Sequence, residues 1–441
     1  MGGERGKERN LTRDFKHSAR NRAPANAAAA KRTAPFAAGG WLLVLLAPAA
    51  AVAQPLTVGQ VLAEARANRQ ELKASRARAE AVAQTPKIVG ALSDPMLMGG
   101  VDHLPFKLNG VNYSVQLQQD FPLSRVRGAR ARTASRQADA ARAQIAITAL
   151  DVEANALRSF LLLVEAQRMK AVTTELRALA AQVQSSVQAR VAATQASLSE
   201  AVRAEVEVAR LDGELLAYER EVLGAWAMTQ AAMGRTSPSA EVPQSELTTP
   251  TRSPSEVSAL VDAAIERRPE LAQMRASAEA ARANVEVMSS MYFPMAFVRL
   301  GAANTMMEGP GLMLMAGVSL PIFRERLGAG YEEASAMSRM AEADVEAMRT
   351  MIQGQVGAAR ERVLSAQARF AAARDRLLPL SQQAVKLAMV AYTSGQLPLV
   401  SVLDAARAQG EAQMDAVRAE LELDAAWIEL GRATGEVNVG S

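Results

Sequence analysis

One long helical segment sets the strongest limit on what this chain can fold into. No proline occurs between Ser124 and Ala192, and apolar residues there recur at alternating spacings of three and four, which is typical of helices that pack along their length. The first of these residues are Ile147, Leu150, Ala154, Leu157, Leu161 and Val164. As a helix rising 1.5 Å per residue, the segment would be roughly 100 Å long, far longer than a small globular domain.

The long segment is part of a plan that occurs twice in the chain. Arg69-Gln70-Glu71-Leu72 recurs as Arg268-Pro269-Glu270-Leu271, and Ala225-Trp226 recurs as Ala426-Trp427. Agreement in order and spacing over most of the chain indicates an internal repeat. We therefore expect a first repeat at 54–235, a linker rich in Ser, Thr and Pro at 236–255, and a second repeat at 256–441. Each repeat is expected to open with one helix, at 58–88 and 256–288.

Both repeats then contain a stretch with the pattern of β-hairpins. Val111, Tyr113, Val115 and Leu117 alternate with polar residues, which predicts a strand with one apolar face. The other expected strands are 96–102, 293–301 and 312–318. Strands of about 9 to 11 residues have the length that a membrane requires, but a barrel closes only with about eight strands or more. If the four strands lie in a membrane, several chains must share one barrel. A soluble four-stranded sheet is the alternative.

Residues 1–53 have the features of an export signal. Lys31-Arg32 precede the apolar run 41–47, and Ala51-Val52-Ala53 follow it, which predicts cleavage near Ala53. A membrane anchor is the alternative. The leader holds nine Lys/Arg and three Asp/Glu out of 50 and 46, so the rest of the chain has a net charge of −2, which gives no support to nucleic-acid binding. The chain has no cysteine, which excludes disulfides and an N-terminal lipid on cysteine.

The signal, the duplicated plan and the strand length together resemble the TolC-like outer-membrane factors of bacterial efflux pumps. Three features carry the resemblance: the strand-to-helix joints, one passage in the second repeat, and the Trp-containing end of each half. The joints are Asp120-Phe121-Pro122-Leu123 and Leu320-Pro321-Ile322-Phe323, and the passage is Tyr392-Thr393-Ser394-Gly395 with Val402-Leu403-Asp404-Ala405. The resemblance implies a mainly α fold with a β membrane part. The protein would be a homotrimer with a trimeric outer-membrane β-barrel, four strands per chain, continued by a long periplasmic α-helical coiled-coil barrel.

The resemblance also implies a function and partners. The chain would be the outer-membrane channel of a tripartite efflux pump, spanning into the periplasm, and its helical hairpins would meet a periplasmic adaptor protein and an inner-membrane pump. It would contact outer-membrane lipid, carry no cofactor and perform no chemistry. No phosphate loop, G-x-S-x-G or H-E-x-x-H motif occurs in the sequence, in agreement with a protein that is not an enzyme. Drug or peptide export, or a secreted periplasmic coiled-coil scaffold without a barrel, are the alternatives.

The same resemblance places a gate at the ends of the helical hairpins. The predicted hairpin turns contain Gly395, Gln396 and Leu397 in the second repeat and Thr194 and Gln195 in the first. Gly395 can adopt a backbone conformation that other residues resist, whereas the first turn has no glycine. Asp404 matches an aspartate ring position of the family, and Tyr392 matches a residue that holds such gates. Ser401 and Leu397 depart from that pattern. A solvated helix start for Asp404 and ordinary packing for Tyr392 are the alternatives.

Methionines suggest a possible cargo. The chain has 20 methionines, and many are near the predicted hairpins, including Met306 and Met307. His103 is the only histidine that follows the leader. Because thioethers bind soft ions such as Cu(I), these three residues are candidate soft-metal contacts. Two features favour the heavy-metal branch of the family: the first hairpin begins with Asp94-Pro95-Met96, and the second hairpin is rich in methionine. Methionine as a filler of irregular apolar surface is the alternative.

Overall fold

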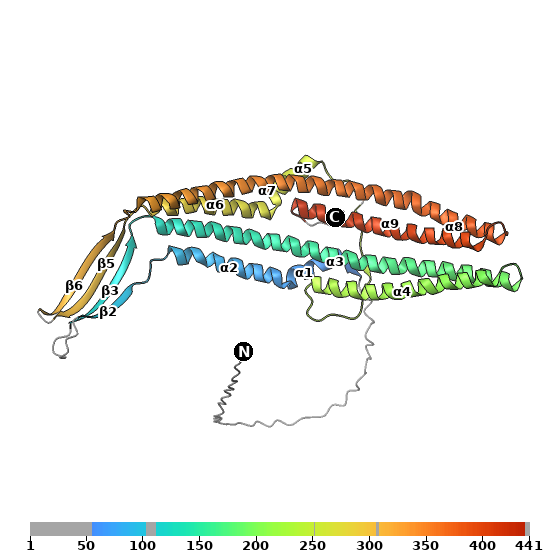
Figure 1. Cartoon of the computed structure of the whole chain (residues 1–441), viewed down its shortest axis with the longest axis horizontal. Helices are drawn as coiled ribbons and strands as arrows, with labels where there is room; N and C mark the ends of the chain where they lie inside the picture. Colours follow the sequence, from blue (N-terminus) through green and yellow to red (C-terminus); the bar gives the residue numbers. More distant parts are fainter. Residues whose placement is uncertain (1–54, 103–111, 251, 306–307, 437–441) are drawn as a thin grey trace, which may run out of the picture. The chain divides into compact units, whose positions relative to one another are not determined.

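A computed structural model describes residues 55–102, 112–250, 252–305 and 308–436, and these residues are mainly helical (Figure 1). The leader at 1–53 therefore lies outside the described residues, as do His103, Met306 and Met307. Within the described part of the chain, no helix has an apolar stretch long enough to cross a membrane.

The same order of elements occurs in both halves of the chain. The first half contains α1 (Val58–Asn68), α2 (Gln70–Gly90), β2 (Met96–Asp102), β3 (Asn112–Pro122), α3 (Val126–Ala192) and α4 (Leu198–Ala232). The second half contains α5 (Val257–Arg267), α6 (Pro269–Ser290), β5 (Met295–Thr305), β6 (Gly309–Ser319), α7 (Arg324–Ala372), η1 (Ala373–Leu377), α8 (Leu378–Thr393) and α9 (Leu399–Thr434). Two short strands, β1 (Leu56–Thr57) and β4 (Ser245–Glu246), pair in parallel.

The prediction of one opening helix in each half was wrong, because each breaks after about three turns. Arg69 separates α1 from α2, and Arg268 separates α5 from α6, both with extended backbones. Pro269 explains the second break, since a residue that precedes proline avoids the helical region. The first break has no such local cause.

Two glycines that sequence analysis missed pack against these breaks. Gly234 and Gly435 follow α4 and α9 with φ angles of 74° and 85°, in the left-handed region that favours glycine. A Cβ on Gly234 would lie 3.0 Å from the carbonyl carbon of Asn68, and one on Gly435 would lie 3.1 Å from that of Arg267. The end of each returning helix thus approaches the backbone of the broken helix too closely for a side chain.

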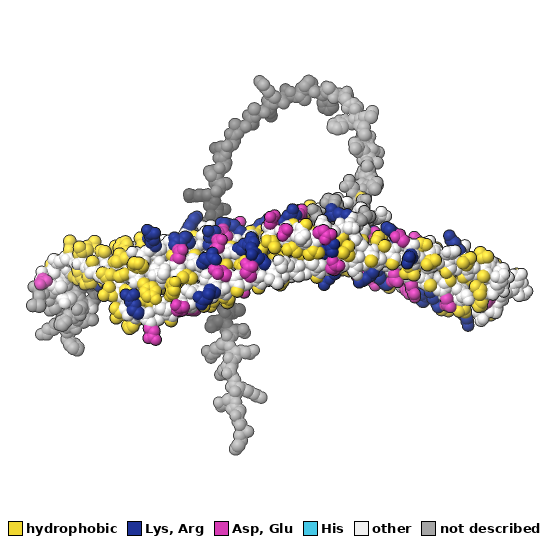
Figure 2. All heavy atoms as spheres, turned by 90° about the horizontal axis from the view of Figure 1, so that it is seen from above, with side chains coloured by type: hydrophobic (Ala, Val, Ile, Leu, Met, Phe, Trp, Pro, Cys, Tyr) yellow, Lys and Arg dark blue, Asp and Glu magenta, His cyan; other side chains and the backbone are white. Residues whose placement is uncertain are grey.

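The predicted strands form one open antiparallel sheet in the order β2-β3-β5-β6. The pairing register aligns Leu97, Leu117, Leu300 and Leu314 in one row across the four strands. All four side chains are exposed, with exposed fractions of 71%, 47%, 56% and 74% in that order. On the opposite face, Arg299 Nη2 donates to Gln118 Oε1 at 2.6 Å, and both side chains are partly covered. The apolar face of this sheet is therefore its exposed one, and hydrophobic side chains gather over the sheet and the adjoining helix ends (Figure 2).

The core lies along α3 and α7. α3 contacts α2, α4, α6 and α9, and α7 contacts α5, α6 and α9. Residues of the predicted seam in α3 are buried, among them Leu157, Leu161 and Val164. A second cluster joins α7 to α9 through Ile352, Val356, Val363 and Trp427. Burial of these apolar stripes contributes more to the stability of the helices than local propensity does.

A π-helical turn interrupts the α7–α8 helix. The N–H of Leu378 donates to the carbonyl of Ala373, five residues earlier, at the junction with η1. Pro379 follows at the start of α8 and has no N–H to continue the ordinary ladder. The wider turn accommodates this proline without ending the helix.

Candidate gate at the turns of the helical hairpins

The two helical hairpins end in turns of the same geometry. In the first, the N–H of Gln195 donates to the carbonyl of Arg190 at 2.8 Å, and in the second Gln396 donates to Ala391 at 2.8 Å. Thr194 and Gly395 occupy equivalent positions with φ angles of 60° and 74°. The expected left-handed conformation at Gly395 is confirmed. The first turn adopts it as well, although the residue there is a β-branched threonine, for which this conformation is strained.

The predicted turn residues are accessible in both hairpins. Thr194, Gln195, Gln396 and Leu397 are all exposed. α4 begins with a capping box in which Ser197 and Glu200 satisfy each other's backbone N–H. The first turn is therefore fixed at its exit by side chains, whereas the second turn exits through Pro398, the N-cap of α9.

Tyr392 joins the two hairpins at this end. Its side chain is 3% exposed and packs with Val187 of α3 and Val402 of α9. The guanidinium of Arg190, on α3, lies 4.5 Å from the centre of the Tyr392 ring and donates to the Tyr392 carbonyl oxygen. Burial, with a contribution from the Glu200 charge, raises the pKa of Tyr392, so its hydroxyl stays neutral. Arg190, which the sequence did not single out, thus ties α3 to α8.

Asp404 lies one turn into α9, with its side chain 64% exposed. Its nearest cation is Arg407, on the same helix, at 3.7 Å between Oδ1 and Nη1. Arg407 is held more tightly by Glu207 of α4, where Nη2 and Oε2 are 2.7 Å apart. Asp404 is therefore an exposed carboxylate beside an arginine that is already engaged, and an exposed pair at this distance contributes little stability.

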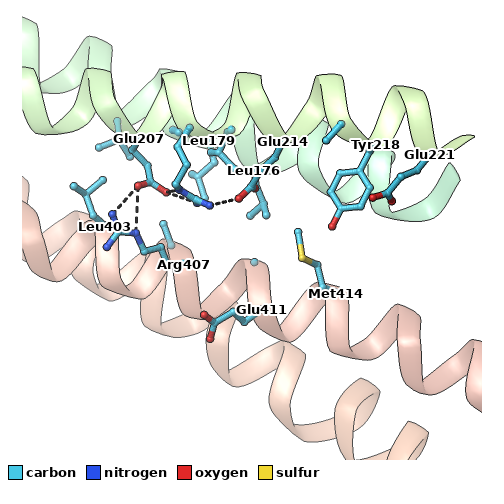
Figure 3. Close-up of a pocket in the computed structure, with 17 residues that line it drawn as sticks. Leu176, Leu179, Glu207, Glu214, Tyr218, Glu221, Leu403, Arg407, Glu411 and Met414 are labelled. Carbon is cyan, nitrogen blue, oxygen red and sulfur yellow. Dashed lines mark hydrogen bonds and ion pairs between the residues drawn. The ribbon is translucent and has the colours of Figure 1, made fainter. Parts of the chain in front are cut away.

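Glu207, on α4, is a buried carboxylate that binds arginines from two helices. Its residue is 5% exposed and it accepts hydrogen bonds from Arg407 and from Arg210, whose Nη2 lies 2.6 Å from Oε1 (Figure 3). Burial acts to raise the pKa of Glu207, but the hydrogen bonds and charges of the two arginines outweigh it and hold the pKa below its usual range. Glu207 stays ionised and links α4 to α9.

A cavity of about 530 Å³ adjoins this ion pair, between α3, α4 and α9. Apolar side chains such as Leu176, Leu179 and Leu403 line it together with charged ones, among them Glu214 and Glu411 (Figure 3). Among the residues that the structure describes, no group of three His, Asp or Glu side chains is arranged to hold a metal ion. The ion pairs of Glu207 tie α4 to α9 beside this cavity.

The structure thus brings Tyr392 and Asp404 to the same end of the hairpins and adds Arg190, Glu207 and Arg407 to them. These three cross-helix partners have no signature in sequence, because each meets a residue about 200 positions away. The remaining site candidates, His103, Met306 and Met307, lie outside the described residues.

Comparison with known proteins identifies the class of protein that shares this fold. Residues 260–436 match the family model described as outer membrane efflux protein. A curated relative is the cobalt-zinc-cadmium resistance protein CzcC of Cupriavidus metallidurans, 27% identical over 304 residues, which cover 68% of this chain and 72% of the relative. The resemblance stated from the sequence is therefore confirmed.

Solved structures share the fold across most of the chain. CusC aligns with a TM-score of 0.76 at 16% identity, covering 86% of this chain and 92% of that one. A membrane protein from Pseudomonas aeruginosa aligns with a TM-score of 0.74 at 20% identity, covering 86% and 93%. The Neisseria gonorrhoeae outer membrane channel MtrE aligns with a TM-score of 0.72 at 16% identity, covering 86% and 89%. The family and these fold neighbours are channel proteins rather than enzymes.

Proposed function

We propose that this chain, a member of the TolC-like outer membrane efflux proteins, forms the outer-membrane channel of a tripartite efflux pump that exports metal cations. It would act as a homotrimer whose twelve-stranded barrel is continued by a periplasmic helical barrel. A periplasmic adaptor and an inner-membrane pump would complete the assembly. The leader would be cleaved near Ala53 on export, leaving no lipid anchor.

The observation that carries this proposal is the inverted sheet. A row of four exposed leucines crosses all four strands, while Gln118 and Arg299 pair on the other face. Water would favour the opposite arrangement, because exposed apolar area is unfavourable at about 25 cal/mol per Å². Lipid favours the observed one, with apolar residues outward and polar residues toward a wet lumen.

The open edges of the sheet support a barrel that several chains share. β2 and β6 are the edge strands, each paired on one side within the described residues. Unpaired backbone groups are not tolerated in lipid, so a sheet placed there must close. Four strands are too few for closure, and three copies would supply twelve.

An exposed apolar stripe on α4 supports contact between copies in the helical region as well. Val202, Val206, Leu216 and Leu223 lie on the heptad spacing of this helix and are 52%, 60%, 65% and 43% exposed. A stripe of this spacing suits packing against another helix. A neighbouring copy would cover it in the trimer.

Engineered disulfides test the shared barrel. Because the chain has no cysteine, a pair placed on β2 and β6, such as Met98→Cys scanned against residues 311–317, would report only edge-to-edge contact. We expect covalent dimers and trimers on non-reducing gels. Val115→Cys with Ala302→Cys, which are partners within one chain, is the matched control and should give an unshifted monomer band. Monomers from every edge pair would contradict the proposal.

Metal cations are the proposed cargo because the curated relative is a cobalt-zinc-cadmium resistance protein. Met306, Met307 and His103 are proposed as contacts for soft ions, and Asp404 with Tyr392 as the gate.

Replacing Met306 and Met307 by Leu should lower the metal tolerance of a host that depends on this channel, at unchanged protein level. Asp404→Ala should raise single-channel conductance and weaken block by cations, because three copies would concentrate negative charge at the pore. Unaltered conductance would contradict the gate assignment.

A further inference from the structure

The two joints between sheet and helices share a pattern that neither the fold nor the channel uses. β3 ends at Pro122 and is followed by Leu123-Ser124-Arg125, whereas Pro321-Ile322-Phe323-Arg324 comes after β6, with Arg326 two residues later. The register places Pro122 and Ser319 on either side of Met295 in one row, so both joints leave the sheet at the same level. We refer to Leu123, Leu320, Ile322, Phe323, Arg125, Arg324 and Arg326 as the collar.

The apolar members of the collar are among the most exposed large side chains of the described chain. Leu123, Leu320, Ile322 and Phe323 are 59%, 68%, 70% and 70% exposed. They continue the exposed apolar face of the sheet beyond the last paired row. A contiguous apolar surface of this kind marks an interaction site rather than ordinary surface.

The arginines of the collar are also exposed, and they make few interactions with other described side chains. Within the described residues, Arg125 and Arg326 form no ion pair, and Arg324 lies 5.8 Å from the centre of the Tyr292 ring. Glu325 is the single acidic residue from 121 to 127 and from 320 to 326. By contrast, Arg127 donates through Nε and Nη2 to the carbonyl oxygen of Gly90 at the end of α2, so it has a structural role and is not part of the collar.

We propose that the collar binds the headgroups of anionic phospholipids in the membrane leaflet nearest the helices, an inference that rests on the proposed function. Its apolar side chains would lie against the acyl chains, and its arginines would meet phosphate oxygens within one helical turn of them. A guanidinium presents paired donors that match phosphate geometry. The occupant is a lipid rather than a soluble anion, because the arginines adjoin exposed apolar side chains, which acyl chains would cover and a soluble anion would not.

The test compares two lipids on the full-length protein purified in mild detergent. Phosphatidylglycerol and phosphatidylcholine of identical acyl chains are titrated in turn, and native mass spectrometry measures the number bound. A basic residue near an anionic lipid surface favours binding by about fivefold. We therefore expect at least a tenfold preference for phosphatidylglycerol, reduced by high salt because the contacts are exposed.

The variant R125Q/R324Q/R326Q should reduce this preference below about threefold. R203Q/R339Q/R376Q removes the same charge from exposed helical positions outside the collar and should leave the preference unchanged. R125K/R324K/R326K retains the charge and should keep most of the preference. If R125Q/R324Q/R326Q does not fold, R125Q/R326Q replaces only the two arginines with neither an ion pair nor a ring contact among the described residues, and it should also lower the preference. An oligomer without lipid preference, or one whose preference survives R125Q/R324Q/R326Q, would overturn the collar alone. A monomer in the same spectra would overturn the proposed channel.

Discussion

Asp424, in the middle of α9, provides the most quantitative prediction. Its residue is 0% exposed, its Oδ2 accepts from Thr249 Oγ1 at 3.0 Å, and its Oδ1 has no hydrogen-bond partner among the described residues. Oε1 of Glu420, one turn earlier, lies 2.9 Å from the same hydroxyl, whose single proton reaches only one of the two carboxyl groups at a time. Glu420 also pairs with Arg168 of α3 at 2.6 Å. Burial, helped by the Glu420 charge and opposed by Thr249 and Arg168, raises the pKa of Asp424 to about 7.

The raised pKa of Asp424 makes the folding stability depend on pH. The folded state holds the Asp424 proton until about pH 7, while the unfolded chain releases it near the usual value of 3.8. The folded state therefore binds more protons between these values, and its stability falls as the pH rises through that window. A difference of this size corresponds to about 4 kcal/mol above pH 7, as an upper value.

Asp424→Asn should remove this loss, because an amide cannot ionise and its oxygen still accepts from Thr249. We expect the variant to unfold at a higher temperature than the wild type at pH 8, with a smaller difference at pH 5 and a similar temperature at pH 4, measured by circular dichroism in detergent at fixed ionic strength. Asp415→Asn, on the same helix but with a side chain 56% exposed, is the matched control and should keep the wild-type pH profile. Parallel pH profiles for wild type and Asp424→Asn would refute the reasoning.

Three further predictions concern the hairpin turns and the ends of the returning helices. Both turn positions have left-handed backbones, so Thr194→Gly should stabilise the protein by about 1 kcal/mol and Gly395→Thr should destabilise it by a similar amount. Equal unfolding temperatures for the two variants would contradict this. Gly435→Ala should lower the unfolding temperature, because a Cβ would lie 3.1 Å from the Arg267 carbonyl carbon, whereas Gly357→Ala, in the open at the middle of α7, should not. Tyr392→Phe should leave stability within about 0.5 kcal/mol of wild type because its buried hydroxyl has no partner among the described atoms. Arg190→Ala should lower the free energy of unfolding by about 1 kcal/mol, because it removes the contact with the Tyr392 ring. A larger loss of stability in Tyr392→Phe than in Arg190→Ala would disprove the assigned contact.

The sequence predicted the strands and the long helices because those elements are encoded by local periodicity. The alternation around Val115 and the heptad seam through Leu157 each depend on residues close in sequence, and burial along one face preserves the pattern. The turn between α3 and α4 was located correctly for the same reason, since the seam stops at Ala192.

Features set by distant partners could not be predicted in this way. The break at Arg69 meets Gly234, which follows a helix about 165 residues later, and the sequence near Arg69 contains no proline or glycine that would predict it. The burial of Asp424 beneath Thr249 and the meeting of Glu207 with Arg407 likewise require knowing which helices lie side by side. For the candidate gate, sequence similarity supplied Tyr392 and Asp404, while the contacts that hold them came only from the fold.

The mass of the membrane-extracted protein in detergent, from light scattering corrected for bound detergent, tests the central claim most directly. A shared barrel requires several chains, so the account predicts a species three times the mass of the chain that remains after leader cleavage. A monomer that stays in solution without detergent would contradict it, because four exposed strands could not then be closed into a channel.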